Sequence, residues 1–382
     1  MKKVFKNGLV YTGKRFVKTD FAVENGRFIK VSDGCEEVDL NDFIVIPGLC
    51  DMHTHGGYGV CFDEIKEEDF EKINQYYVSK GATSVLATTS TIDERKLKKQ
   101  LTILAKLCED YPVFKGIHME GPFLSLEYKG GMMKEYLQTP SVEKFKEYQR
   151  CAKGYIKLIT ISPEIDGAVE FIKKVSETGV VVSLGHSGAT YEQTNLALAN
   201  GARSFTHTFN AMKPITHKTE GSILINALES DAYIEIIADG KHVNKDLFKL
   251  LLKCKGKNKI IGISDSLKEA GLPDGDYIKE DGRILRKNGM DLIYMDSNTR
   301  AGSSIGIFEC LFNFSEFTNL DIEECLPVYS KNVADLLNLN SGVIKEGKDA
   351  DFIIVKDNKI AKVFSKGECV FDGVWSGVKN KK

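Results

Sequence analysis

The fold is decided by the stretch PGLCDMHTHGGYG, residues 47–59. The apolar run Phe43–Ile46 leads into it, and an apolar run bounded by proline and glycine is typical of a buried β-strand. Side chains two residues apart on a strand share a face, so Asp51, His53 and His55 should point the same way. Two neighbouring imidazoles at a strand end provide half of a metal site, or are ordinary surface histidines beside a turn. The positions of the other histidines decide between these two interpretations.

The composition limits the class of protein. The 382 residues are 42% hydrophobic, which is enough for one large domain and a smaller one. The net charge is −2 and no basic block occurs, which argues against a nucleic-acid or membrane-surface partner. No apolar run reaches membrane-spanning length, and the N-terminal residues lack the apolar core of a signal peptide. The nine cysteines form no Cys-x-x-Cys motif, so we expect a reduced, cytoplasmic protein in which Cys50 and Cys61 are packing residues rather than ligands.

Both ends of the chain are rich in short β-strand signals. Asn7-Gly8 and Asn25-Gly26 each separate two β-rich segments, and Asn-Gly is the strongest short hairpin signal. Residues 351–371 have the same character, with β-rich pieces separated by turns. We therefore predict a small β-sandwich domain formed by residues 1–46 and 341–382, because chain termini often lie close together. Two unrelated β appendages are the alternative.

The middle of the chain alternates short apolar runs with amphipathic segments. The apolar runs are Leu49–Met52, Ser84–Ala87, Phe114–Ile117, Ile156–Ile161, Val180–Leu184, Arg203–Thr206, Tyr233–Ile237 and Ile260–Ser264. Helical patterns follow most of them, for example Glu68–Lys80, Asp93–Cys108, Ala168–Thr178 and Tyr191–Asn200. Eight β-then-α units predict an α/β fold, a (β/α)₈ TIM-like barrel over residues 47–340. A doubly wound open sheet is the competing architecture, but it usually has a glycine-rich phosphate loop where this chain has the histidine pair.

Two segments lie outside the repeating pattern. Lys268–Arg300 contains many glycine and aspartate residues and is expected to form a long loop or a hairpin, and long loops are often functional. Thr318–Leu339 is expected to form helices after the last barrel strand.

Polar side chains gather at the ends of the predicted strands. Six of the seven histidines lie there or just beyond, together with several carboxylates. They are His53, His55, His118, His186, His207 and His242, with Glu120, Asp239 and Asp265. The carboxyl ends of barrel strands meet on one face, and imidazole plus carboxylate is the ligand set of a hydrolytic divalent metal. Each residue alone has an ordinary interpretation as a core histidine or a capping carboxylate, but their joint placement predicts a metal site.

Longer motifs around these residues resemble a known family. They are His53-Thr54-His55-Gly56, His118-Met119-Glu120-Gly121-Pro122, Gly185-His186-Ser187-Gly188, His207-Thr208-Phe209-Asn210-Ala211-Met212, Asp239-Gly240-Lys241-His242, Ser264-Asp265 and Ala301-Gly302-Ser303. Their order resembles the amidohydrolase superfamily and, within it, the family of N-acetylglucosamine-6-phosphate deacetylases, over nearly the whole chain. The His-x-His motif marks only the superfamily, whereas Glu-Gly-Pro together with Asn-Ala-Met is specific.

The resemblance implies a reaction and a set of site residues. The reaction is the metal-dependent hydrolysis of the N-acetyl group of N-acetylglucosamine 6-phosphate, giving glucosamine 6-phosphate and acetate in amino-sugar catabolism or recycling. The implied ligands are Glu120, His186 and His207 for the principal metal, and His53 and His55 for a second metal with Glu120 bridging. Asp265 matches the general base, which takes a proton from the attacking water and passes it to the departing amine. Zn²⁺ and Fe²⁺ both suit these donors, with one or two ions per subunit.

The resemblance also implies how the sugar phosphate is bound. The implied sugar contacts are Asn210, the backbone amide of Ala211, His242 and the turn Ala301-Gly302-Ser303. In the family a basic residue, often an arginine of the neighbouring subunit, binds the phosphate, and Lys218 stands at that position here, beside His217. This implies a homodimer that acts on a small amino-sugar phosphate. A surface lysine without a role is the alternative for Lys218.

One departure from the family pattern leaves the substrate open. Some members have a histidine near the acetyl group where this chain has Met132, and a thioether cannot donate a hydrogen bond to a carbonyl. Deacetylation of another N-acetylhexosamine 6-phosphate, such as the galacto epimer, fits the sequence as well.

Two other functions fit less well. A cyclic-amide hydrolase or a deaminase is disfavoured, because strand four ends in Ser162-Pro163-Glu164 without the modified lysine that cyclic-amide hydrolases commonly use. A non-catalytic binding protein of this fold would be expected to lack some of the metal ligands or the base.

Overall fold

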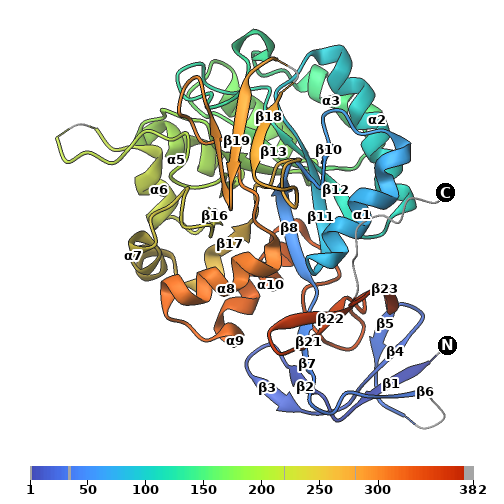
Figure 1. Ribbon diagram of the computed structural model, residues 1–382. Helices are drawn as coiled ribbons and strands as arrows, with labels where there is room; N and C mark the ends of the chain where they lie inside the picture. The colour runs from blue at the N-terminus through green and yellow to red at the C-terminus, as the bar shows by residue number, and fades with distance from the viewer. Residues whose placement is uncertain (1, 33–35, 219, 280, 374–382) are drawn as a thin grey trace.

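The computed structural model describes residues 2–32, 36–218, 220–279 and 281–373. A barrel surrounded by helices forms the larger part, and a smaller β-rich part lies below one end of strand β8 (Figure 1). The smaller part is built from both ends of the chain, as predicted. The exact boundaries at 46/47 and 340/341 stay a prediction, and residues 1, 33–35 and 374–382 of the predicted small domain lie outside the described residues.

In the described chain, the barrel is one sheet of eight parallel strands. They are β8 (Leu49–Thr54), β11 (Ala82–Thr89), β12 (Phe114–Glu120), β13 (Ile156–Ile161), β14 (Val181–Leu184), β15 (Ala202–Phe205), β16 (Tyr233–Ile237) and β17 (Ile260–Ile263). Consecutive strands are hydrogen-bonded neighbours, and the Asp265 N–H donates to the His53 carbonyl at 2.9 Å, which joins the ends of β17 and β8. The predicted (β/α)₈ barrel is confirmed, and each predicted apolar run overlaps one of its strands.

Helices follow the barrel strands. They are α1 (Phe70–Ser79), α2 (Glu94–Asp110), α3 (Val142–Cys151), α4 (Ala168–Ser176), α5 (Tyr191–Ala199), α6 (Ile223–Glu229), α7 (Asp246–Lys255), α8 (Ile307–Thr318), α9 (Ile322–Cys325) and α10 (Lys331–Leu337). The short elements are β9 (Gly56–Gly57), β10 (Val60–Cys61), η1 (Glu67–Asp69), η2 (Lys134–Tyr136), η3 (Lys257–Lys259) and η4 (Leu326–Tyr329). Local capping explains where some helices begin: the Asp93 carboxylate accepts the N–H groups of Arg95 and Lys96, at 3.0 and 3.1 Å, ahead of α2. The expected helices between Thr318 and Leu339 are present, and the structure adds α8 before them.

The two ends of the chain share two sheets. One has the order β5 (Arg27–Ile29), β4 (Phe21–Glu24), β1 (Lys3–Lys6), β6 (Glu36–Asp39), and the other β23 (Glu368–Asp372), β22 (Lys359–Ser365), β21 (Phe352–Lys356), β7 (Ile44–Pro47), β2 (Leu9–Tyr11), β3 (Phe16–Lys18). Rings from the two sheets pack together: the Phe5 centroid lies 5.1 Å from that of Phe352 and 5.5 Å from that of Phe364. The ends therefore form one β-sandwich, and the alternative of two unrelated appendages is wrong.

Of the two hairpins predicted near the N-terminus, one is confirmed and one is wrong. Asn25-Gly26 joins the antiparallel strands β4 and β5. Asn7-Gly8 lies between β1 and β2, which belong to different sheets. Asn7 does adopt a turn conformation, with φ 64°, and its N–H donates to Asp20 at 2.9 Å. The turn carries the chain from one sheet to the other, because the hydrogen-bonded neighbours of β1 are β4 and β6.

The segment Lys268–Arg300 contains a three-stranded antiparallel sheet. Its strands are β18 (Gly275–Ile278), β19 (Ile284–Asn288) and β20 (Asp291–Tyr294). This β18–β20 sheet stands on the side of the barrel away from the sandwich (Figure 1). Among the described residues, none of the helices could span a lipid bilayer.

Candidate active site

Six of the side chains predicted at the strand ends meet in two groups. The Glu120 group is Glu120, His186 and His207, and the Asp265 group is His53, His55 and Asp265. Within each group the donor atoms lie within 4.8 Å of one another, and all six residues are buried. The barrel therefore brings donors from five different strand ends to one place.

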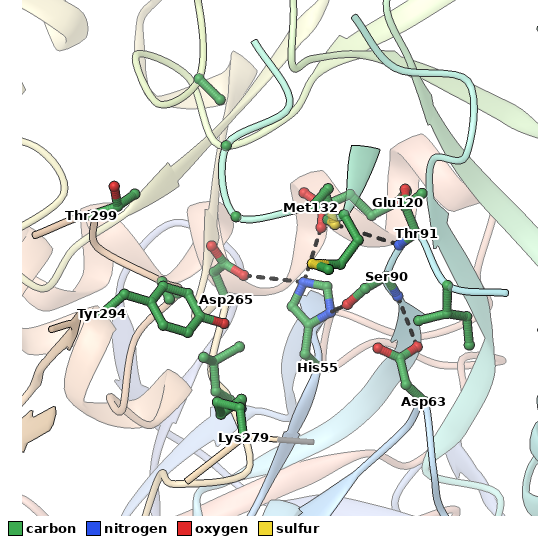
Figure 2. Close-up of a pocket in the computed structure, with 18 of the residues that line it drawn as sticks. His55, Asp63, Ser90, Thr91, Glu120, Met132, Asp265, Lys279, Tyr294 and Thr299 are labelled. Atoms are coloured by element: carbon green, nitrogen blue, oxygen red, sulfur yellow. Dashed lines mark hydrogen bonds and ion pairs between the residues drawn. The ribbon is translucent and has the colours of Figure 1, made fainter. Parts of the chain in front are cut away.

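Glu120 faces both groups. Its Oε1 lies 3.1 Å from His186 Nε2 and 3.0 Å from His207 Nε2. Its Oε2 lies 3.1 Å from His55 Nε2, which in turn is 3.4 Å from Asp265 Oδ1 (Figure 2). One carboxylate thus spans the two groups, which is the arrangement of a bridging ligand.

Three of these residues have left-handed backbone conformations that side chains other than glycine rarely adopt. The φ angle is 49° at His186, 29° at His207 and 49° at Asp265. Such conformations persist only where the surroundings enforce them, and they cluster at functional sites. Here the Asp265 N–H donates to the His53 carbonyl at 2.9 Å, and the Ser162 hydroxyl donates to the His186 carbonyl at 2.6 Å. The strand ends therefore fix the donors through the backbone as well as through side-chain packing.

Three of the imidazoles in the two groups have partners on their outward nitrogens, and the first, His53 Nδ1, lies 2.9 Å from Glu235 Oε2. His186 Nδ1 lies 2.9 Å from the carbonyl of Tyr128, which only accepts, so Nδ1 carries the proton and Nε2 presents a lone pair to the group. His55 Nδ1 lies 3.2 Å from the hydroxyl of Ser90, whose N–H donates to Asp63 at 2.9 Å (Figure 2). These partners orient the rings toward the shared space.

Charges within the two groups shift one another's pKa values. Burial raises the pKa of Glu120, but the surrounding histidines, His53 foremost, outweigh it and hold that pKa well below its ordinary value. Burial also raises the pKa of Asp265, and His53 and His55 together lower it below its ordinary value. For His55, burial lowers the pKa, but Asp265 and Glu120 raise it to about 9. Both carboxylates are therefore ionised at neutral pH.

The donor atoms fit a divalent cation. The Nε2 atoms of His186 and His207 lie 3.1 Å apart and face the same carboxylate oxygen. His53 Nε2 is buried and has no hydrogen-bond partner among the described residues. Buried polar atoms normally have a partner, so converging nitrogen and oxygen donors of this kind indicate a cation. Cys61 lines the neighbouring cavity, but neither donor group contains a cysteine.

A cavity of 770 Å³ borders both groups, which is ample for a sugar phosphate. The predicted substrate residues that line it are Met132, Asn210, Ala211, His242, Ala301 and Gly302. Ser303 does not line it; this residue is buried, and its hydroxyl donates to the Ser264 carbonyl at 2.5 Å. Lys218 also lies elsewhere, exposed on the loop between β15 and α6, which projects from the side of the barrel (Figure 1). The structure thus gathers six of the eight predicted substrate residues at the cavity.

Comparison with known proteins decides the family. The sequence profile of the amidohydrolase family matches residues 44–370. Over 340 residues, the chain is 33% identical to the N-acetylglucosamine-6-phosphate deacetylase of Bacillus subtilis (strain 168), covering 86% of this chain and 85% of that protein. The chain belongs to the amidohydrolase family.

Two solved structures extend the likeness to the whole amidohydrolase fold. The N-acetylglucosamine-6-phosphate deacetylase of Pasteurella multocida has a TM-score of 0.90 at 26% identity, covering 97% of this chain and 99% of that one. A mutant of the Mycobacterium smegmatis enzyme, in complex with N-acetyl-D-glucosamine-6-phosphate, has a TM-score of 0.88 at 26% identity, with 97% and 99% covered. The resemblance to N-acetylglucosamine-6-phosphate deacetylases is confirmed.

Several residues at the amidohydrolase site escape prediction from the sequence. Those contributed by the segment around the β18–β20 sheet are Lys268, Lys279, Arg283, Tyr294, Thr299 and Arg300, which line the cavity. Arg283 ties this segment to the loop after β12, because its Nη2 donates to the Gly131 carbonyl at 3.4 Å. Glu235, whose Oε2 lies 2.9 Å from His53 Nδ1, also escapes prediction. The available signal for Glu235 is a single carboxylate in the otherwise apolar run Tyr233–Ile237.

Proposed function

We propose that this amidohydrolase hydrolyses the N-acetyl group of N-acetylglucosamine 6-phosphate, releasing acetate and glucosamine 6-phosphate, in amino-sugar catabolism or recycling. The observation that carries the proposal is the position of Glu120, which spans two groups of metal donors beside Asp265 in a cavity of sugar-phosphate size. The names of the Bacillus subtilis relative and of the Mycobacterium smegmatis complex support the same reaction.

The reaction requires a divalent metal, which the donor groups fit. The residues that would hold it are Glu120, His186 and His207 for the principal ion, and His53, His55 and Asp265 for a second ion, with Glu120 bridging. We propose Zn²⁺ or Fe²⁺, since both accept nitrogen and carboxylate donors. When bound, the cation polarises the acetyl carbonyl and lowers the pKa of the attacking water.

Asp265 provides the acid–base step. Burial raises its pKa, but His53 and His55 lower it below the ordinary value, so the carboxylate is ionised at neutral pH and accepts a proton from the water. An amine leaves poorly unless it is protonated, so the same carboxyl then donates the proton to the departing nitrogen. The backbone carbonyl of Asp265 accepts the Ser303 N–H at 2.7 Å, and this hydrogen bond helps to hold Asp265 in its left-handed backbone conformation.

Binding of the sugar ring falls to residues that line the cavity. They are Asn210, the amide of Ala211, His242 and the turn at Ala301-Gly302. Gly302 has φ 50°, and a Cβ atom there would lie 2.7 Å from the Asp265 carbonyl, so only glycine allows this close approach. Ser303 does not line the cavity and so does not contact the sugar; its hydroxyl donates to the Ser264 carbonyl and supports the turn.

Met132 lines the cavity near His55 (Figure 2). Its sulfur accepts the Thr91 N–H at 3.5 Å, and the Thr91 hydroxyl donates to the Glu120 carbonyl at 3.2 Å. A thioether has no hydrogen to donate, so residue 132 does not polarise the acetyl carbonyl.

The phosphate is bound by Lys218 of a neighbouring subunit in a homodimer. Four cations that line the cavity already have carboxylate partners: Lys268 pairs with Glu64, Lys279 with Glu269, Arg283 with Asp281 and Arg300 with Asp291. Lys218 is exposed on a projecting loop and does not line the cavity of its own subunit. A lysine delivered from a second subunit therefore adds the positive charge that a phosphate needs.

The test is acetate release from a panel of N-acetylated sugars, with and without the 6-phosphate, in metal-free and metal-loaded protein. We expect N-acetylglucosamine 6-phosphate to have the highest kcat/KM, and activity to disappear on chelation and to return with Zn²⁺ or Fe²⁺. A higher kcat/KM for the galacto epimer would reassign the substrate. Full metal content without acetate release from any sugar would contradict the proposal and favour a non-catalytic binding protein.

A further inference from the structure

Glu235 lies in the middle of β16, and its side chain is fully buried. Removing a carboxylate from water costs free energy unless the carboxylate is hydrogen-bonded. Its hydrogen bonds fall on one oxygen: Oε2 lies 2.9 Å from His53 Nδ1 and accepts the backbone N–H of His207 at 2.9 Å. Oε1 has no hydrogen-bond partner among the described residues. The Glu235 carboxylate therefore hydrogen-bonds to two residues whose side chains are proposed metal ligands.

The two partners of Glu235 belong to different donor groups. His53 is on β8 and in the Asp265 group, whereas His207 follows β15 and is in the Glu120 group. Strand β16 is the neighbour of β15, but β17 separates it from β8, so the Glu235 side chain reaches across to His53. Glu235 does not border the cavity and so cannot touch a substrate there. Any influence it has on the reaction passes through the histidines.

The contact with His53 decides which nitrogen of that ring faces Glu120 and Asp265. A carboxylate only accepts hydrogen bonds, so Nδ1 carries the proton and Nε2 presents its lone pair. That Nε2 lies 3.5 Å from Glu120 Oε1 and 3.6 Å from Asp265 Oδ1. The corresponding partner of His55 is the Ser90 hydroxyl, which can donate or accept and so leaves the tautomer of His55 open.

We propose that Glu235 is a positioning residue that fixes His53 as a metal ligand, and so enables the Asp265 group to hold a second cation. This inference rests on the two-ion form of the proposed function. His207 has a further backbone constraint, because its carbonyl accepts the Asn210 N–H at 3.0 Å. Loss of the Glu235 carboxylate should therefore weaken cation binding by the Asp265 group more than cation binding by the Glu120 group.

The test compares Glu235→Leu with Glu235→Gln in the full chain, loaded with Zn²⁺ and desalted, with metal per chain measured by mass spectrometry. Leucine removes the acceptor, whereas glutamine keeps one oxygen for both hydrogen bonds and places its NH₂ where Oε1 has no partner. We expect two ions in the wild type, one in Glu235→Leu, and two in Glu235→Gln with about tenfold weaker binding of the second. Glu269→Gln is the matched control, because Glu269 is a buried carboxylate paired with Lys279 and outside both donor groups.

A second comparison separates positioning from a general structural role. His53→Gln should lose the same ion as Glu235→Leu, and the double variant should lose nothing further, because both changes remove one ligand. Circular dichroism and thermal unfolding identify which variants are folded. If Glu235→Leu does not fold, the affinity of Glu235→Gln for the second ion decides, and an unchanged affinity overturns the inference.

Three further results would overturn it: a wild type that holds one ion, a Glu235→Leu variant that holds two as tightly as the wild type, or equal losses in the leucine and glutamine variants. Acetate release by the wild type is measured separately. A wild type that hydrolyses the substrate, together with a Glu235→Leu variant that keeps both ions, would reject the role of Glu235 and leave the proposed function intact.

Discussion

The rim of the barrel, where the carboxyl ends of the strands carry the two donor groups, differs from the outer segments of this amidohydrolase in burial and in hydrogen bonding. At the rim, Glu120 and His207 are buried and each contacts several fixed partners. In the outer parts, Lys218 is exposed on a projecting loop, and Ile278 on the β18–β20 sheet is 76% exposed. The proposed metal donors thus lie in the buried, hydrogen-bonded part of the molecule, whereas Lys218 and the β18–β20 sheet lie in exposed parts. The effects of substitutions should therefore decrease from the rim outward.

The largest loss is expected for Asp265→Asn. The amide cannot take the proton from water or return it to the amine, so kcat should fall roughly 10³-fold while the principal metal stays bound. Acetate release and metal content measure this. Asp291→Asn makes the same exchange in the outer β18–β20 sheet, where Asp291 pairs with Arg300, and should change kcat by less than about threefold. Undiminished turnover in Asp265→Asn would remove Asp265 from the role of base.

His207→Ala should lose the principal metal, because it removes one of three buried donors. We expect metal affinity to fall at least about a hundredfold, with a lower unfolding temperature in metal-loaded samples, since bound metal stabilises the folded state. Metal analysis and thermal unfolding measure both effects. The control is His217→Ala on the projecting loop, which should bind metal like the wild type; equal metal content in the two variants would exclude His207 as a ligand.

Asp239→Asn should have an intermediate and pH-dependent effect. Burial lowers the pKa of His242, but the Asp239 carboxylate, 2.7 Å from His242 Nδ1, raises it above its ordinary value. His242 is thus charged below this raised pKa and neutral above it. Without the carboxylate the pKa falls, so the charged form is lost at lower pH and KM near pH 7 should rise about tenfold. Steady-state kinetics over a pH series measure the shift, and an unchanged pH profile of kcat/KM would contradict a charged His242 in substrate binding.

The smallest loss is expected for Lys218→Ala. An exposed charge contributes about 1 kcal/mol, so KM for the phosphorylated sugar should rise about fivefold with kcat unchanged. Lys213→Ala in the same loop, where Lys213 pairs with Glu220 at 3.4 Å, is the matched control with little effect.

Mixed dimers provide a sharper result for the shared phosphate site. Lys218→Ala and Asp265→Asn subunits, when combined, should form one site that has both native residues, so the mixed dimer should have the wild-type KM, whereas the Lys218→Ala parent has the raised KM and the Asp265→Asn parent has almost no turnover. Absence of this complementation, or a monomer in sedimentation, would contradict the shared site.

The sequence predicts the rim well because its signals are local. Histidines are few in this chain, and apolar runs followed by glycine mark where each strand ends, so His53 and His207 are assigned to strand ends without a structure. The barrel rule then places all such ends on one face. The (β/α)₈ order is predicted for the same reason, since each unit has its own apolar run and its own helical pattern.

Some features escape prediction because the local sequence signal is absent or misleading. Asn7-Gly8 has the local signal of a hairpin, but the pairing of β1 with β6 sends the two flanking strands into different sheets. The segment Lys268–Arg300 is expected to form a long loop or a hairpin, and its antiparallel strands agree with a hairpin. The short strands have many exposed residues, so no apolar run marks each of the three. Glu235 is one carboxylate in a strand, and only the folded barrel shows that it reaches His53.

The pairing of β7 with β21 has a consequence for chains that end early. Strand β7 leads through Gly48 into β8, and the Gly48 N–H donates to the Asp351 carbonyl at 2.9 Å. A translation product that stops before β21 contains every proposed metal donor. It lacks the strand that pairs with β7, however, so one edge of β7 has unpaired backbone groups next to the start of β8. Open strand edges recruit strands from other chains. Premature termination late in the message should therefore produce insoluble aggregates rather than a shortened, metal-loaded enzyme.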